Sequence, residues 1–179
     1  MELSKKFKII RLIILIIFII SCIILIIEAA TPGSASSNKS NFVSDAIANT
    51  INGISEAFTK KPKITDFDSF RAFIRKAVGH YGAFLFMSIF ATLSAMLYYH
   101  KNSWKVFIIK IIIVISFGIL FAALTESIQL MIPGRAGQIR DIFIDFSGYM
   151  TSSLIIILIF FIKYYIQYIN RDKKEELEF

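Results

Sequence analysis

The sequence predicts an all-α integral membrane protein with about four transmembrane helices. Three observations favour this fold class: 56% of the 179 residues are hydrophobic, the mean hydropathy is +0.66, and four apolar stretches are long enough to cross a bilayer. A helix that rises ~1.5 Å per residue needs ~20 residues to cross a hydrocarbon core of ~30 Å. Helices are expected because unpaired backbone groups cannot face lipid. The predicted spans are residues 9–27, 81–99, 106–124 and 142–162.

The first span is interpreted as an uncleaved anchor. Its segment IISC, residues 19–22, resembles a lipoprotein cleavage box, so a cleaved signal peptide is the alternative. The apolar run continues beyond Cys22 as IILII, where a cleaved protein would turn polar, and it is longer than the apolar region of a typical signal peptide. Cys22 is the only cysteine, so we expect neither an internal disulfide nor a thiolate metal cluster.

Residues 28–80 are predicted to form an extracytoplasmic loop with amphipathic helices. The segment ATPGSASSNKS, residues 30–40, is small, polar and contains Pro and Gly, so it is expected to be a flexible exit from the membrane. In residues 41–58 the apolar side chains recur near helical spacing, which indicates a helix that lies on the membrane surface or covers the ends of the spans. Covering the spans is the favoured alternative. Asp66 or Asp68 is expected to cap a helix that continues into the second span.

The basic residues indicate the orientation of the chain. They cluster beside the hydrophobic ends, and loops rich in Lys and Arg stay in the cytoplasm. The three clusters are Lys5, Lys6, Lys8 and Arg11 before the first span, Lys101 and Lys105 between the second and third, and Lys163, Arg171, Lys173 and Lys174 after the fourth. Loop 28–80 is also basic, but long loops translocate with less regard to charge.

We therefore expect a multi-pass membrane protein with both termini in the cytoplasm. The expected organisation is a cytoplasmic tail and first span (1–27), the external loop (28–80), a three-helix membrane core (81–162) and a cytoplasmic tail (163–179). The net charge of +7 is explained by this orientation, so no nucleic-acid partner is expected.

Polar residues form a stripe on each of the last two spans. Their spacing places each set on one helix face, and small residues in the stripes allow close helix packing in lipid. The stripes are Gly118, Ala122, Glu126 and Gln129 on the third span, and Asp141, Asp145, Gly148 and Ser152 on the fourth. The two spans are expected to meet across these stripes. Pro133 and Gly134 turn the chain between them, which makes Arg135 and Arg140 available to Glu126 and Asp141.

These motifs carry a family resemblance. TESIQ (125–129), PGR (133–135), RD (140–141) and IDFSG (144–148) together resemble the signature of the VanZ-like family of small membrane proteins. RKAVGH (75–80), followed by Phe84, resembles the second family signature, a basic pair and a histidine at the start of a span. The resemblance covers residues 70–153. It departs from the commonest pattern at Asp145, where Asn is frequent, and at His80, which follows Lys76 by four residues where three is usual.

The resemblance implies association with resistance to glycopeptide antibiotics, teicoplanin in particular, in a bacterial envelope. It implies no mechanism. The predicted functional cluster consists of His80, Arg75, Lys76, Glu126, Gln129, Arg135, Arg140, Asp141 and Asp145.

Three interpretations of this cluster remain. In the first, the charges form an ion-pair network that only holds the last two spans together. In the second, they bind a lipid-linked or peptidoglycan-related envelope ligand in contact with the lipid bilayer. In the third, a carboxylate or His80 acts as general base in a hydrolase or transferase. Binding is preferred to catalysis because the sequence lacks G-x-S-x-G, H-E-x-x-H and P-loop motifs. No cofactor and no metal ion are expected, because the arginines can neutralise the acids.

Overall fold

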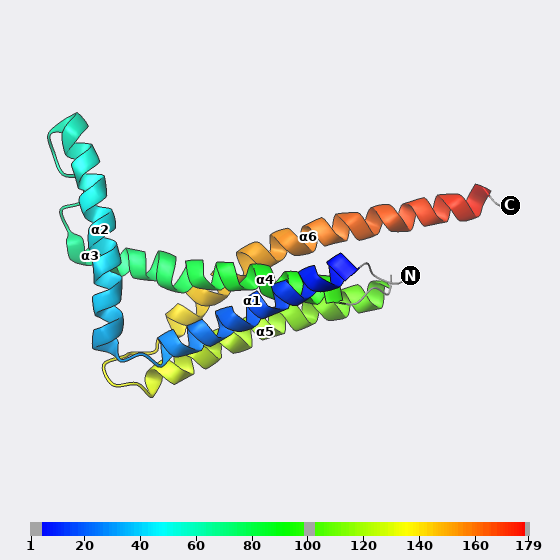
Figure 1. The fold of residues 1–179 in the computed structure, drawn as a ribbon, viewed down its shortest axis with the longest axis horizontal. Helices are drawn as coiled ribbons and strands as arrows, with labels where there is room; N and C mark the ends of the chain where they lie inside the picture. The colour runs from blue at the N-terminus through cyan, green and yellow to red at the C-terminus, as the bar shows by residue number, and fades with distance from the viewer. Residues whose placement is uncertain (1–4, 99–102, 178–179) are drawn as a thin grey trace.

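The computed structural model describes residues 5–98 and 103–177, with side chains described as far as Asn170. The described chain is entirely helical (Figure 1). Its elements are α1 (Lys5–Ala29), α2 (Gly33–Thr59), α3 (Phe67–Ile74), the π-helical segment η1 (Arg75–Gly82), α4 (Ala83–Tyr98), α5 (Trp104–Leu130) and α6 (Ile139–Leu177). The predicted fold class is confirmed.

Four helical stretches are long and apolar enough to cross a membrane, as predicted. They are Lys5–Ala29, Phe67–Tyr98, Trp104–Leu130 and Ile139–Asn170, each longer than the span predicted there. Tyr99 is the predicted end of the second span and Lys101 belongs to the predicted basic loop, and both lie outside the described residues. The side chains of Arg171, Lys173 and Lys174 also lie outside them.

The second span is one continuous helical stretch formed by α3, η1 and α4. It begins at Asp66, whose side chain accepts a hydrogen bond of 3.0 Å from the backbone N–H of Ser69, so the predicted cap is confirmed. The hydrogen bonds with Ser69 lower the pKa of the Asp66 carboxyl. Beyond α3 the helix widens into η1, and such π-helical turns are frequent at functional sites.

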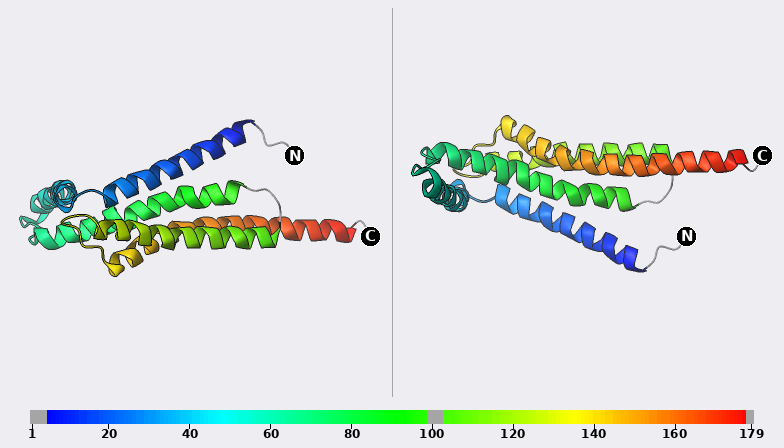
Figure 2. Two further views of the ribbon diagram at one scale, coloured as in Figure 1. Left: turned by 90° about the horizontal axis from the view of Figure 1, so that it is seen from below. Right: turned by 90° about the horizontal axis from the view of Figure 1, so that it is seen from above.

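Helix α4 contacts each of the other three spanning helices and lies between α1 and α6 (Figure 2). Tyr149 of α6 is fully buried beside Phe84, Met87 and Phe121 of the neighbouring spans. At Gly118 of α5 a Cβ atom would collide with the Tyr149 ring, so the absence of a side chain lets α5 approach α6.

The two predicted polar stripes are both buried, but they meet each other only in part. Gly148 of α6 lies against the backbone of Tyr81, and Ser152 donates a hydrogen bond of 2.8 Å to the carbonyl of Leu85 and contacts the hydroxyl of Ser88. The stripe on α6 therefore packs mainly against η1 and α4. A helix in this bundle has more than one neighbour, and the spacing of a stripe does not specify which one it meets.

Helix α2 crosses the end of the bundle at which α1 and α5 end and α6 begins (Figure 1), here called the α2 end. The expectation of a flexible exit over residues 30–40 is wrong, because α2 begins at Gly33. The backbone N–H of Gly33 donates to the carbonyl of Pro133 at 3.3 Å, and Ser36 accepts a hydrogen bond from Arg135. These contacts with the turn before α6 hold the serine-rich segment in a helix.

The apolar side chains of α2 do not pack on the bundle. Phe42 is 77% exposed and Phe58 is 86% exposed, while the residues buried in α2 are Gly33, Ser44 and Ala48. The helix is held instead by two hydrogen bonds of 2.7 Å from Arg71 of α3 to Asp45. Helix α2 therefore lies across the ends of the spans through polar contacts, while its large apolar side chains Phe42 and Phe58 stay exposed.

Candidate functional site

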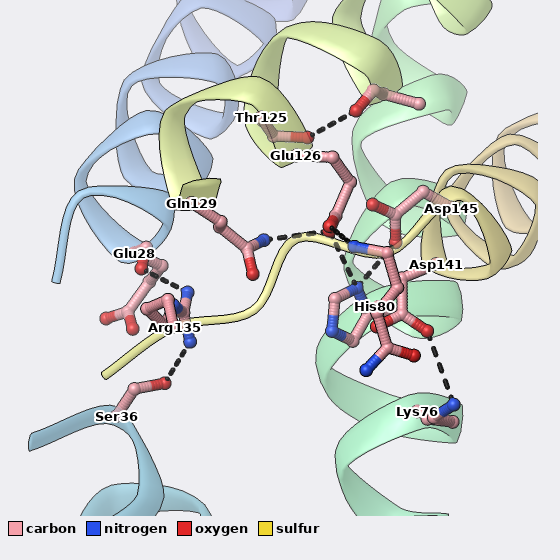
Figure 3. A network of polar contacts seen from close by, with 12 residues as sticks. Glu28, Ser36, Lys76, His80, Thr125, Glu126, Gln129, Arg135, Asp141 and Asp145 are labelled. Carbon is pink, nitrogen blue, oxygen red and sulfur yellow. Dashed lines mark hydrogen bonds and ion pairs between the residues drawn. The ribbon is translucent and has the colours of Figure 1, made fainter. Parts of the chain in front are cut away.

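Four ionisable side chains from three spans converge near the α2 end of the bundle (Figure 3). They are His80 of η1, Glu126 of α5, and Asp141 and Asp145 of α6, here called the acid–histidine cluster. Glu126 lies one turn before the end of α5, and the two aspartates lie in the first two turns of α6. The cluster therefore lies within about two helical turns of the helix ends, or ~10 Å.

The imidazole of His80 lies between two buried carboxylates. Its Nδ1 atom is 3.0 Å from Oδ1 of Asp145 and 3.9 Å from Oε1 of Glu126. Asp145 is 1% exposed and Glu126 is 2% exposed, so water reaches neither carboxylate freely. Figure 3 shows the other ring nitrogen of His80 directed away from both carboxylates. Asp145 therefore orients the ring and leaves one nitrogen available to a further group.

Lys76 and His80 face α6 as a matched pair. Nζ of Lys76 is 3.3 Å from Oδ1 of Asp141, an ion pair without hydrogen-bond geometry, and one turn further His80 contacts Asp145. Residues 76 and 80 and residues 141 and 145 are each four apart, and the two helices run in the same direction. Lys76 and His80 both lie in the π-helical segment η1, which therefore presents both side chains to α6.

Glu126 is held by two hydrogen bonds. Nε2 of Gln129 donates to its Oε1 at 2.9 Å, and the backbone N–H of Gln138 donates to its Oε2 at 3.0 Å. Gln129 was predicted to belong to the cluster, whereas Gln138 was not. Its contact is made by the backbone, and no residue type in the sequence signals it.

Arg135 does not pair with the acids, contrary to the expectation from the sequence. Its guanidinium donates at 2.7 Å to Oγ of Ser36 and at 2.8 Å to the carbonyl oxygen of Glu28. It thus joins the ends of α1 and α2 to the turn before α6 (Figure 3). The turn contains Gly134 with φ +72°, a conformation that favours glycine and directs the following residue toward α2.

The surroundings of Arg135 disfavour its positive charge. Burial lowers the pKa of its guanidinium, and the positive charge of Arg75 lowers it further, while Glu126 and Glu28 act in the opposite direction. Its Nε atom is buried without a hydrogen-bond partner among the described residues. Arg135 therefore keeps one donor that the protein does not use.

Arg75 and Arg140 remain outside the cluster. Both are exposed, and no ion pair involves either of them within the described part of the chain. Arg75 lines a hollow of about 250 Å³ between α2 and α3, together with Ser37, Ser40, Asn41, Asp68 and Arg71. Of the nine predicted site residues, five thus lie together with His80. The three arginines lie outside this group at its edge, which is here called the rim.

The cluster holds more negative than positive charge. The charge of Asp141 is compensated by Lys76. Glu126 and Asp145 have one titratable base between them, the imidazole of His80. One ligand atom from each of His80, Glu126 and Asp145 lies within 4.8 Å of the other two, so these three side chains are candidate metal ligands. Among the described residues no ion pair joins Arg75, Arg135 or Arg140 to these acids, so neutralisation by the arginines is not an argument against a metal ion here.

The chain was compared with protein families, curated proteins and solved structures. No curated protein and no solved structure matches it. The family model described as VanZ/LLP1 matches residues 12–161, which is most of the chain and contains all four spans in whole or in large part. The chain therefore belongs to the VanZ/LLP1 family.

Proposed function

We propose that this VanZ/LLP1 protein binds an anionic group of a lipid-linked or peptidoglycan-related molecule at the outer face of the bacterial plasma membrane. Binding occurs where the acid–histidine cluster meets the basic residues beside α2, and it contributes to resistance to glycopeptides such as teicoplanin. The observation that carries the proposal is the set of polar groups at this end that have no partner among the described residues. They are the second nitrogen of His80, Nε of Arg135 and the guanidinium of Arg75.

A scaffold alone does not account for this arrangement. A network that served only to hold helices would be expected to pair its acids with the available arginines, since a buried charge without a partner destabilises the fold. Here Glu126 and Asp145 share one histidine, while Arg75 and Arg140 are exposed. Ionisable groups in membrane spans are rare unless they serve a function.

The chemistry of the rim favours a phosphate or carboxylate. A guanidinium offers two parallel donors that match either anion, and Arg75 and Arg135 both lie beside the first part of α2. The hydroxyls of Ser37 and Ser40 and the amide of Asn41 line the adjoining hollow and add neutral donors.

Catalysis on the same ligand is the second candidate, and the contact between His80 and Asp145 favours it. A carboxylate that accepts from Nδ1 keeps Nε2 as the basic nitrogen, which is the arrangement of a general base. In a hydrolase or transferase, Nε2 would take the proton of the attacking nucleophile while Arg75 and Arg135 hold the anionic group. His80 would act as the base and Asp145 as the acid that orients it, and no nucleophile is assigned among the described residues.

Two substitutions at the rim test the binding function. Arg75→Gln removes an exposed charge, and Arg135→Lys keeps the charge but loses the fork of donors. Each variant is expected to retain membrane abundance near that of the parent, to lose the envelope lipid that copurifies after mild extraction, and to lower the teicoplanin resistance of the host. Lys60→Gln, an exposed cation at the far end of α2, is the matched control and is expected to change neither.

The same variants distinguish the two candidates. If His80→Gln retains the copurified lipid while resistance is lost, the ligand is bound and the missing step is catalytic. If Arg75→Gln and Arg135→Lys retain both the lipid and full resistance, neither arginine recognises an anion and the proposal is wrong.

A further inference from the structure

A second binding feature lies at the opposite end of the bundle. A hollow of about 270 Å³ is bounded by the first part of α1 and the last part of α4. Figure 2 shows these two helices diverging toward the N-terminal end of α1 in both views. The hollow is apolar over most of its wall, which is formed by Leu12, Ile14, Leu15 and Leu97. Leu12 is also 56% exposed, so the hollow opens to the side of the bundle rather than into its core.

The open side of the hollow faces lipid. Residues 5–29 and 67–98 form two of the four candidate spans, so the hollow lies between two membrane-spanning helices. An apolar space at this position is not filled with water, because its walls offer few hydrogen bonds. A hydrocarbon chain from the bilayer fits this chemistry.

Basic side chains mark one end of the hollow. Lys8 and Arg11 of α1 line it, and Arg11 donates to the carbonyl of Tyr98 at 2.6 Å with its guanidinium carbon 4.9 Å from the centre of the Tyr98 ring. Lys110 of α5 donates to the carbonyl of Met96 at 2.9 Å, close by on α4. None of the eight residues that line the hollow is acidic. This end therefore attracts an anionic headgroup.

One polar group of the wall has no partner in the protein. Oγ of Ser94 is buried and makes no hydrogen bond among the described residues. A buried hydroxyl without a partner is unfavourable, and a ligand that passes this point with an ester or hydroxyl oxygen would satisfy it. Glycerol esters join the headgroup of a phospholipid to its acyl chains, so they lie between a charged end and an apolar one.

We propose that this hollow binds one anionic glycerophospholipid, with an acyl chain against Leu12, Leu15 and Leu97 and its phosphate beside Lys8 and Arg11. The site is separate from the acid–histidine cluster and does not depend on the function proposed for it. It would fix the position of α1 against α4 at the end where the two helices diverge.

Native mass spectrometry of the full chain tests the site. The protein is released from vesicles of equal parts phosphatidylglycerol and phosphatidylcholine with the same acyl chains. Phosphatidylglycerol carries a net negative charge, and phosphatidylcholine carries no net charge. One phosphatidylglycerol is expected to remain bound in preference to phosphatidylcholine. Lys8→Gln with Arg11→Gln is expected to lower that preference roughly fivefold for each cation removed. Lys5→Gln with Lys6→Gln removes two charges of the same helix that do not line the hollow and is expected to leave the preference unchanged.

A variant that fills the hollow separates a specific site from general attraction to a basic surface. Ser94→Leu adds apolar volume to the wall and removes the hydroxyl, so it is expected to reduce the bound phosphatidylglycerol without changing any charge. The proposal is overturned if the parent retains both lipids equally, or if the Lys5–Lys6 variant loses as much preference as the Lys8–Arg11 variant. Equal retention by Ser94→Leu and the parent would also contradict it.

Discussion

Nδ1 of His80 and Oδ1 of Asp145 lie 3.0 Å apart, and this contact joins the start of the second span to the start of the fourth. Glu126 of the third span lies 3.9 Å from the same nitrogen. Three spans thus meet at one imidazole ring. Because the acids lie on the Nδ1 side, the contact also determines which ring nitrogen is available to other groups.

The first prediction concerns the tautomer of His80. In nanodiscs at neutral to alkaline pH, the ¹⁵N spectrum of neutral His80 is expected to show a protonated Nδ1 and an unprotonated Nε2. Replacing Asp145 with Leu removes the acceptor and is expected to produce a mixture of tautomers. The sequence has a second histidine, His100, whose signals are identified with His100→Gln. A protonated Nε2 in the parent would contradict the contact described here.

The second prediction concerns the packing of α5 on α6. Gly118→Leu places a side chain where the Tyr149 ring lies, and overpacking of this kind is expected to cost about 1–3 kcal/mol of unfolding free energy. Gly53→Ala is the matched control, because nothing lies within 4 Å of the added Cβ. It replaces glycine in the exposed part of α2 and is expected to be neutral or to stabilise the helix by up to about 1 kcal/mol.

Thermal melting in detergent measures both variants. Equal melting temperatures for the parent and Gly118→Leu would show that α5 and α6 do not approach each other at this glycine.

The third prediction concerns the attachment of α2 and its dependence on pH. The hydrogen bond from Arg71 holds the pKa of the Asp45 carboxyl below its usual value. A carboxyl with a lowered pKa in the folded state stabilises the attachment at pH values above its unfolded pKa, and this contribution is lost as the pH falls through the folded pKa. The hold on α2 is therefore expected to be constant near neutral pH and to weaken only in strong acid.

Hydrogen exchange of α2 amides measures this attachment. Asp45→Asn is expected to lower the protection factors of the α2 amides at neutral pH to the values that the parent reaches in acid. Glu56→Gln, an exposed acid on the same helix, is the control and is expected to have no effect. Slow exchange in Asp45→Asn would show that other contacts hold the helix.

The fourth prediction concerns orientation, which rests on the basic clusters beside the spans. A membrane-impermeant thiol reagent is expected to label cysteines introduced at Asn38 and Ala136 in intact cells and to leave a cysteine at Asn170 unlabelled. All three positions are exposed, and the first two lie beside the α2 end. Cys22 is replaced by serine in each variant to remove the native thiol. Labelling at Asn170 alone would reverse the orientation.

Much of the fold could be predicted because it depends on local properties of the sequence. The four spans follow from apolar length, and the start of the second span follows from Asp66, whose carboxylate caps the helix at the next residue. The helical state of residues 33–40 could not be predicted, because it depends on distant contacts. Gly33 and Ser36 bind the turn at Pro133 and Arg135, about 100 positions along the chain.

The sequence indicated most of the residues that meet in the polar cluster, but not how they pair. The acids and Gln129 follow from polar residues at helical spacing, and His80 follows from the resemblance. The partners of Arg135 could not be predicted, since opposite charge suggested Glu126 while the turn at Gly134 directs the guanidinium to Ser36 and the carbonyl of Glu28. One of these partners is a backbone carbonyl, which residue type does not indicate.

The substitution Glu126→Gln tests most directly whether the acid–histidine cluster binds a ligand or only holds the spans together. Three quantities are compared with the parent: membrane abundance, melting temperature and teicoplanin resistance. If the cluster is only a scaffold, the loss of a buried charge is expected to cost about 3–5 kcal/mol, and all three fall together. Ligand binding predicts that resistance is lost while abundance and melting stay near the parent values, because functional sites often keep charges at the expense of stability. A fall in all three quantities, restored together by a second substitution that repacks the cluster, would contradict the account.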